Sequence, residues 1–167
     1  MQINSQVKKF STNIGKRLLV GLKFSLVISL LAYSALNLSV QLKTKTVKIF
    51  NNKASRKAKL VLQVEMADTE QTLLSGLSYR KSLPEKHGML FSFRAPQKGF
   101  FWGKNTFIPL DLIFIDNNRK IVQISQIKSH DLTQIVSKVP VLYAIELNQG
   151  TANKYGLQVG DQLAWDY

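Results

Sequence analysis

The clearest pattern in the sequence is an alternation of apolar and polar residues that begins near position 60. In residues 59–67 (KLVLQVEMA), the apolar side chains of Leu60, Leu62, Val64 and Met66 occupy every second position. A period of two predicts a strand with one buried face. Further strands are predicted in the same way over residues 89–93, 100–102, 111–116, 120–127 and 139–147, with a last strand that ends at residue 165.

Signals for turns and short helices separate these strands. Asp68 is expected to cap a first helix that ends at Gly76, and Thr151 is expected to cap a second. Asn117-Asn118 predicts a hairpin, because asparagine tolerates positive φ. Strands joined by tight turns pair antiparallel. The sequence therefore predicts an α+β fold: a compact β-rich domain with a mainly antiparallel, curved or barrel-like sheet and two short helices.

A different pattern precedes this domain. Residues 24–40 (FSLVISLLAYSALNLSV) are seventeen uncharged and mostly apolar residues, and four basic residues precede them between positions 8 and 17. As a helix this run would be roughly 25 Å long, close to the thickness of a hydrocarbon core. We therefore predict that residues 1–42 are a basic region followed by a signal peptide or an uncleaved signal-anchor helix. The domain that follows is expected on the extracytoplasmic side, periplasmic or extracellular.

The net charge of +13 is not spread evenly along the chain. Residues 1–59 carry 12 lysines and arginines and no acid, whereas residues 60–167 carry 11 basic and 10 acidic residues. The surplus thus lies in the N-terminal arm, where residues 43–59 are expected to form a solvated basic linker. A nearly neutral domain lacks the clustered cations that phosphate binding requires. The expected partner is the membrane, reached through the N-terminal segment, and not nucleic acid.

The residue types also limit the chemistry. The chain has no cysteine, which excludes disulfides, thiol nucleophiles and thiolate metal ligands. His87, expected in a turn, and His130, next to Asp131, are the only histidines and fall short of a usual set of metal ligands. The sequence therefore predicts no metal site and no cofactor. It also lacks the G-x-S-x-G motif of a hydrolase nucleophile.

Residues 99–116 (GFFWGKNTFIPLDLIFID) are the stretch whose residue types best suit ligand binding. Pro109 predicts a kink within it. It brings together aromatic rings, a lysine, two hydrogen-bonding side chains and an acid, which are the usual components of a small-ligand site. A structural role is an equal alternative, in which the polar groups satisfy the backbone at the kink and the tryptophan fills the core. The candidate ligand-binding residues are Trp102, Lys104, Asn105, Thr106 and Asp111.

Two acids in apolar strands are candidates for catalysis. Asp111 precedes the apolar run LIFI, and Glu146 lies within YAIEL at residues 143–147. Two carboxylates within roughly 5–10 Å of each other in a cleft would suit acid–base chemistry. The simpler interpretation is structural, with Lys104 or Arg80 compensating a buried Asp111. The sequence leaves both interpretations open.

Four segments of the chain resemble those of a known family. The matching pieces are VEMADTEQTLLSGL at 64–77, YRKSLPEKHGMLFSF at 79–93, FFWGKNTFIPLDLIFID at 100–116 and YAIELNQGTANKYGLQVGDQL at 143–163. Together they resemble the bacterial and archaeal family known as domain of unknown function 192. The resemblance implies a small β-rich domain over residues 60–167, often behind a signal peptide or a membrane segment, and no established activity.

Three positions depart from the family pattern. The family has arginine where this chain has Leu73, and methionine where it has Ser78 and Gly103. If the two methionine side chains meet at one site, their joint loss would open a hole or remove a contact for a soft metal. A divergent member with altered function is therefore one expectation.

Three functions remain as hypotheses from the sequence. The first is an extracytoplasmic, membrane-associated domain that binds a small ligand or serves as an accessory protein, and is not an enzyme. The second is a hydrolase-like enzyme that uses Asp111 and Glu146, with Lys104 orienting the substrate. The third is a module that binds another protein of the cell envelope.

Overall fold

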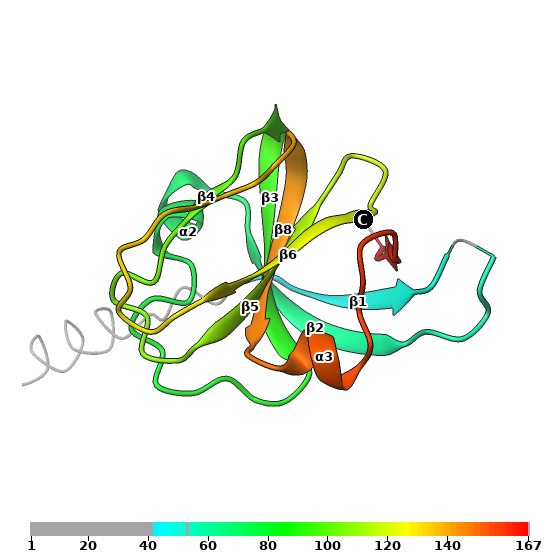
Figure 1. Cartoon of the computed structure of the whole chain (residues 1–167), viewed down its shortest axis with the longest axis horizontal. Coiled ribbons are helices and arrows are strands. Elements are labelled where there is room, and N and C mark those ends of the chain that lie inside the picture. Colours follow the sequence, from blue (N-terminus) through cyan, green and yellow to red (C-terminus); the bar gives the residue numbers. More distant parts are fainter. Residues whose placement is uncertain (1–41, 53, 167) are drawn as a thin grey trace, which may run out of the picture. The chain divides into compact units, whose positions relative to one another are not determined.

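A computed structural model describes residues 42–52 and 54–166, which belong to one compact unit. Seven strands form a single sheet in the order β6-β5-β8-β3-β2-β1-β9, and two short strands form a separate ribbon, β4-β7 (Figure 1). The sheet strands are β1 (Thr44–Phe50), β2 (Leu60–Ala67), β3 (His87–Gln97), β5 (Leu110–Ile115), β6 (Ile121–Ile127), β8 (Val141–Asn148) and β9 (Gln162–Ala164). The ribbon and the helices are β4 (Phe100–Phe101), β7 (Ile135–Val136), α2 (Glu70–Ser75) and α3 (Thr151–Lys154).

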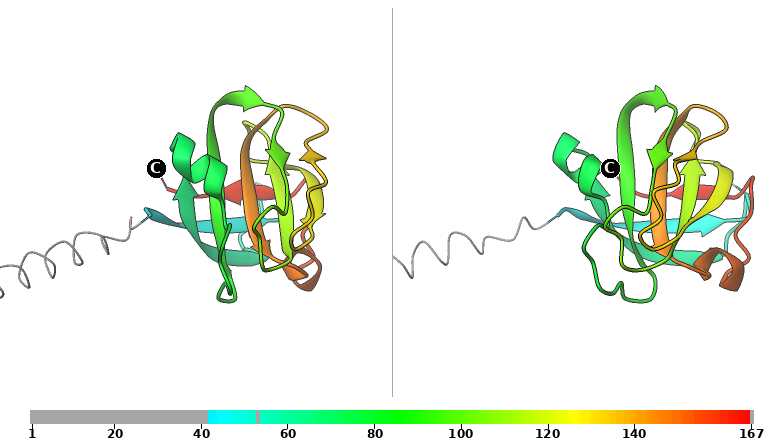
Figure 2. Two further views of the ribbon diagram at one scale, coloured as in Figure 1. Left: turned by 90° about the vertical axis from the view of Figure 1, so that its left-hand side faces the viewer. Right: turned by 60° about the vertical axis from the view of Figure 1, so that its left-hand side comes forward.

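The sheet is curled into a half-barrel, as the two further views show (Figure 2). All neighbouring strands pair antiparallel except β2 and β3, which pair in parallel across a connection that contains α2. The two outer strands of the order, β6 and β9, approach each other at an antiparallel bridge between Lys120 and Gln162. The Leu163 N–H donates to the Arg119 carbonyl at 2.8 Å, which continues that contact. The predicted β-rich α+β domain with a curved sheet is thus confirmed.

The strands bury side chains on both faces of the sheet, which is why β5 is apolar at nearly every position. The inner core, on the concave face, takes side chains from all seven strands of the sheet, including Leu62, Ile113 and Leu147. The outer core packs between β3, β5 and β8 and the segments that cross over them, and includes Phe91 and Phe114. The stretch from β4 to β5 belongs to this covering layer.

The prediction of a solvated linker over residues 43–59 is wrong for residues 44–50, which form β1 between β2 and β9. Val47 and Ile49 are completely buried, whereas Lys48 between them is exposed. Lys48 therefore occupies an outward position of the strand, whereas Lys45 is half-buried and donates to the Asp166 carbonyl at 2.6 Å. The lysines made the segment look like a linker, because its apolar alternation has only two fully buried positions.

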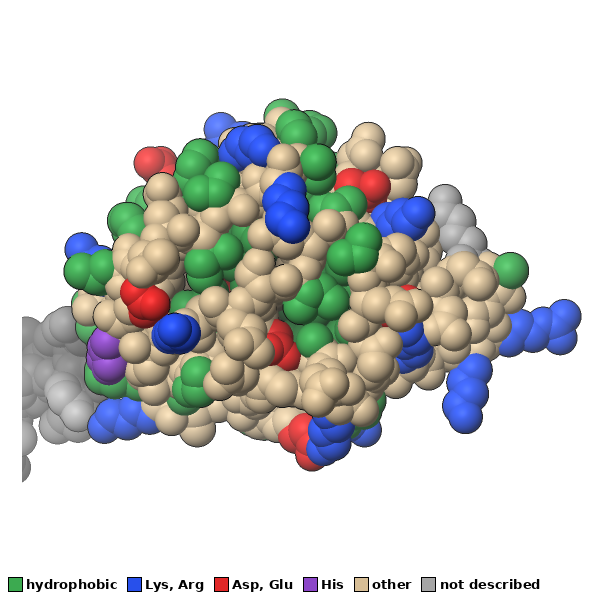
Figure 3. All heavy atoms as spheres, in the orientation of Figure 1, with side chains coloured by type: hydrophobic (Ala, Val, Ile, Leu, Met, Phe, Trp, Pro, Cys, Tyr) green, Lys and Arg blue, Asp and Glu red, His purple; other side chains and the backbone are tan. Residues whose placement is uncertain are grey.

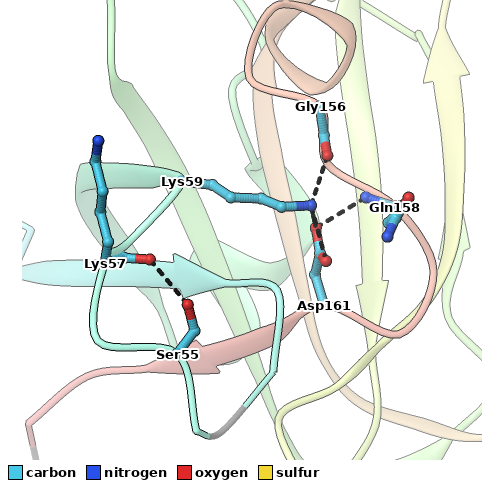
Figure 4. A network of polar contacts seen from close by, with 6 residues as sticks. All are labelled: Ser55, Lys57, Lys59, Gly156, Gln158 and Asp161. Carbon is cyan, nitrogen blue, oxygen red and sulfur yellow. Dashed lines mark hydrogen bonds and ion pairs between the residues drawn. The ribbon is translucent and has the colours of Figure 1, made fainter.

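A buried ion pair fastens the segment after β1 to the end of the domain (Figure 4). Asp161 is completely buried, and its carboxylate accepts hydrogen bonds from Lys59 Nζ at 2.8 and 3.0 Å. Lys59 Nζ also donates to the Gly156 carbonyl at 2.7 Å, and the Gln158 N–H donates to Asp161 at 3.0 Å. The negative charge is thus compensated and hydrogen-bonded from several sides.

Local details of the helices differ from the sequence predictions. Thr69, and not Asp68, caps α2: its hydroxyl accepts a hydrogen bond from the Thr72 N–H, and the Thr69 N–H donates to the Thr72 hydroxyl. Gly76 ends α2, as predicted. Gly150, and not Thr151, is the N-cap of α3. His87 begins β3 and does not lie in a turn.

The predicted signal or anchor segment over residues 24–40 lies outside the described residues. Within residues 42–52 and 54–166, no helix is both long and apolar enough to cross a bilayer.

Candidate functional site

The residues singled out around Trp102 lie in a segment that leaves the sheet after β3 and crosses its outer face. The crossing begins at Gly99. A Cβ at this position would lie only 2.8 Å from the Phe114 ring, so the backbone can pack this closely only with glycine. The Gly99 N–H donates to the buried hydroxyl of Ser137 at 2.9 Å, next to the β4-β7 ribbon. Phe101 points inward, where its ring makes edge contacts with Phe91 at 5.0 Å and with Phe114 at 5.6 Å between centroids. The alternation along β4 therefore turns its neighbours Phe100 and Trp102 outward.

Exposed apolar side chains gather on this covering layer. Of ten large hydrophobic side chains that are exposed among the described residues, eight lie in residues 74–79, 100–107 and 132–139. Figure 3 shows hydrophobic side chains at the surface over β4, with lysine or arginine side chains among them. We call the central group the aromatic patch: Tyr79, Phe100, Trp102, Phe107, His130, Leu132 and Val136.

Backbone hydrogen bonds hold the segments of the aromatic patch together. The Tyr79 N–H donates to the Asn105 carbonyl at 2.8 Å, and the His130 N–H donates to the Thr106 carbonyl at 3.1 Å. The Phe107 ring lies between Tyr79 at 6.4 Å and His130 at 5.0 Å, measured between ring centroids. Three segments that are distant in the sequence therefore form one surface.

Three of the five predicted ligand-binding residues belong to this surface. The Trp102 side chain is 52% exposed, and Lys104 Nζ lies 5.9 Å from the centroid of its ring. Asn105 adopts a positive φ of 58°, and its Nδ2 donates to the Tyr79 hydroxyl at 2.7 Å. Lys104 and Asn105 thus flank the aromatic rings with a cation and an amide.

The other two predicted residues, Thr106 and Asp111, do not line the surface. Thr106 is 5% exposed, and its carbonyl accepts bonds from the Ser129 hydroxyl and the His130 N–H. Asp111 is 2% exposed and accepts the Ala152 N–H at 2.8 Å, which fixes the start of α3. Neither Lys104 nor Arg80 compensates Asp111, since Arg80 forms an ion pair with Glu65. Both side chains are therefore buried and do not contribute to the exposed surface.

The structure separates the two candidate catalytic acids. In the register between β5 and β8, Leu112 is opposite Glu146 and Asp111 is opposite Leu147. Successive side chains point to opposite faces of a sheet, so Asp111 lies on the inner face and Glu146 on the outer face. The carboxylate pair required by the hydrolase hypothesis is therefore not formed.

Glu146 has an unusual environment of its own. It is 5% exposed, and its Oε2 lies beside Gly76 and accepts the Leu77 N–H at 3.3 Å. No lysine or arginine in the described part of the chain forms an ion pair with it. Burial raises the pKa of Glu146 from its ordinary value of 4.5 to about 7, and the Leu77 N–H opposes that rise.

Potential metal-binding clusters and hollows are the other features of the described residues that could mark a site. No group of three or more histidine, aspartate or glutamate side chains between residues 42 and 166, residue 53 aside, is placed to hold a metal ion. Two open hollows of about 450 and 340 Å³ are bordered by parts of β1 and β9. Neither hollow includes Trp102 or Lys104.

Gly103 is one of the three positions that depart from the family pattern, and the absence of a side chain there leaves no cavity. A Cβ at Gly103 would lie only 2.0 Å from the Lys128 carbonyl oxygen, because the backbone of residues 128–131 packs directly against it. The Gly103 N–H donates to the Asp131 carbonyl at 2.7 Å. The Ser78 hydroxyl donates to the carbonyl of Lys104 at 3.4 Å, and Leu73 packs against the outer core.

We expect the substitution Gly103→Ala to lower the free energy of unfolding by about 2–3 kcal/mol, because the new methyl group meets backbone that must shift. The measurement is urea unfolding followed by circular dichroism. Gly156→Ala is the matched control: its φ is positive, but a Cβ there has nothing within 4 Å, so we expect a cost of about 1 kcal/mol. Equal costs at the two positions would show that the contact between Gly103 and Lys128 is not tight.

Comparisons with known proteins agree with this fold. Residues 51–165 match the model of domain of unknown function 192, which is described as "Uncharacterized ACR". The chain belongs to this uncharacterised family. No curated protein matches it.

Two solved structures are similar to the chain. One is a proposed transcription regulator from Sinorhizobium meliloti 1021, with 34% sequence identity, a TM-score of 0.71, and coverage of 76% of this chain and 97% of that one. The other is a protein of unknown function from Novosphingobium aromaticivorans DSM 12444, with 29% identity, a TM-score of 0.70, and coverage of 77% and 90%. The similarity covers nearly all of both relatives.

Proposed function

We propose that the protein is an extracytoplasmic, membrane-associated binding domain and that the aromatic patch is its recognition surface. The observation that carries the proposal is that six of the ten exposed large hydrophobic side chains among the described residues belong to this patch. A contiguous exposed apolar surface is typical of a binding site. Aromatic rings beside a lysine and an amide offer both apolar area and orienting hydrogen bonds.

The membrane association rests on the sequence. The uncharged run of residues 24–40, led by basic residues, is typical of a signal peptide or signal anchor. Such a segment exports the domain that follows it. The absence of cysteine from the whole chain is compatible with an oxidising compartment.

Two other functions have less support. The hydrolase hypothesis loses its basis because Asp111 and Glu146 lie on opposite faces of the sheet. We do not extend the regulator description of the Sinorhizobium protein to this chain, because residues 60–167 carry 11 basic and 10 acidic residues. DNA binding requires an excess of cations on one face.

The experiment that tests this proposal locates the domain with single cysteines, which is possible because the chain has none of its own. Val159 is 62% exposed, so Val159→Cys presents an accessible thiol. In intact spheroplasts of a bacterial host that expresses the full chain, we expect a membrane-impermeant maleimide to label Val159→Cys. Ser5→Cys, on the other side of the apolar run, should stay unlabelled until the cells are lysed. Labelling of Val159→Cys only after lysis would contradict the proposal.

A further inference from the structure

The aromatic patch has the composition of a surface that meets a bilayer at the level of the lipid headgroups. Its exposed rings include Tyr79, Phe100, Trp102 and Phe107. Tryptophan and tyrosine combine an apolar body with a polar group, which is why they are enriched at membrane interfaces. Aliphatic side chains alone would not distinguish a lipid surface from a protein partner.

The charge around the patch has the sign that anionic lipids attract. The segments 98–107 and 128–139 carry four lysines, at positions 98, 104, 128 and 138, and one acid, Asp131. Lysine stems lie along apolar surface while their ammonium groups reach outward to headgroups. A lysine-rich aromatic surface is the chemistry that binds an anionic interface.

The place where the chain enters the domain supports the same partner. Leu42, the first described residue, packs against the outer core, which the segments of the patch cover. The apolar run of residues 24–40 ends two positions earlier, and two residues span at most about 7 Å. A bilayer that held this run would therefore lie within a short reach of the domain.

We propose that the aromatic patch inserts into the headgroup and upper acyl region of an anionic bilayer, so that the domain lies flat on the membrane that anchors it. This inference rests on the proposed function, because it requires the N-terminal segment to be membrane-bound. It goes further by naming lipid, and not a soluble ligand, as the occupant of the patch. Bilayer contact at this depth, about 5–10 Å below the surface, is typical of interfacial binding.

The two tryptophans allow a direct test. Trp102 is 52% exposed in the patch, whereas Trp165 is 8% exposed and packs against Tyr143, and the apolar run contains no tryptophan. The full chain is reconstituted in nanodiscs that contain phosphatidylglycerol, with and without bromine on the upper acyl chain. We expect brominated lipid to remove roughly a third of the emission of the wild-type protein and almost none from Trp102→Phe, because only Trp102 reaches the quencher.

Two further comparisons test whether the lipid charge and the lysines contribute to the contact. Replacing phosphatidylglycerol by phosphatidylcholine should reduce the quenching, and so should the double substitution Lys104→Gln and Lys128→Gln, because the lysines no longer meet anionic headgroups. Equal quenching of wild type and Trp102→Phe would overturn the inference. So would a Trp102 that is shielded from aqueous iodide but untouched by brominated lipid, since a protein would then cover the patch. These outcomes leave the labelling of Val159→Cys unaffected, so the two proposals fail separately.

Discussion

Replacing Lys59 with methionine should lower the free energy of unfolding by about 3–5 kcal/mol, because it leaves a buried carboxylate without its cation. Asp161 is completely buried and takes two hydrogen bonds from Lys59 Nζ, whose side chain is 18% exposed. Methionine keeps most of the length of the side chain and removes only the charge and the donor. The measurement is the midpoint and slope of urea unfolding.

The matched control is the exposed ion pair between Lys154 and Glu85, with an N–O distance of 2.6 Å. Both partners are largely exposed and screened by water, so Lys154→Met should change the free energy of unfolding very little. Similar losses for Lys59→Met and Lys154→Met would show that the pair at Asp161 does not fasten the two ends of the domain.

A second large effect concerns Glu146 and depends on pH. Its pKa is about 7 in the folded protein, against 4.5 ordinarily, because burial disfavours the charged form. Between these values the folded protein holds a proton that the unfolded chain has lost. The stability that this proton contributes is fully present below about pH 4.5 and is lost as pH rises through about 7, a total of about 3 kcal/mol.

Glu146→Gln removes this titration while keeping the shape of the side chain. We therefore expect the variant to be more stable than the wild type at pH 8, by up to about 3 kcal/mol, and to lose the fall in stability between pH 4.5 and 7. The measurement is chemical unfolding at a series of pH values. Glu85→Gln is the control, because the hydrogen bond from Lys154 lowers the pKa of the exposed Glu85 and moves its titration below this window. An unchanged slope in Glu146→Gln would contradict the account of a buried, uncompensated carboxyl.

The alternation of apolar residues was sufficient to predict most of the sheet. The strands expected at residues 59–67, 111–116 and 120–127 correspond to β2, β5 and β6, and the hairpin at Asn117-Asn118 joins the last two. These segments have a continuous apolar face, or two in β5, which leaves little ambiguity about their state.

The strand β1 was not predicted because its lysines mask its apolar positions and one of its two partners, β9, is distant in the sequence. Lys43, Lys45 and Lys48 give the segment the charge of a linker. Only its place between β2 and β9, which supply its hydrogen bonds, makes it a strand. The short ribbon β4-β7 depends in the same way on contact between residues 100–101 and 135–136.

The site was predicted in part, for a similar reason. Trp102 belongs to the aromatic patch, and Lys104 and Asn105 flank its rings. Thr106 and Asp111 fall within the same short stretch but are buried, because Thr106 lies in the packed segment before β5 and β5, which contains Asp111, is buried at every position. The contributions of Tyr79 and His130 come from other segments, and no signal in the sequence places them beside Phe107.

The measurement that tests the central claim most directly compares a cysteine in the patch with one outside it. Phe107 and Val159 are both exposed in the domain itself, at 45% and 62%. In membranes that carry the full chain, a water-soluble maleimide should react with Phe107→Cys about tenfold more slowly than with Val159→Cys, because the patch is covered. Detergent should bring the two rates together. Equal rates in intact membranes would show that the patch is open to water, and the claim that it is the occupied surface of a membrane-associated domain would be contradicted.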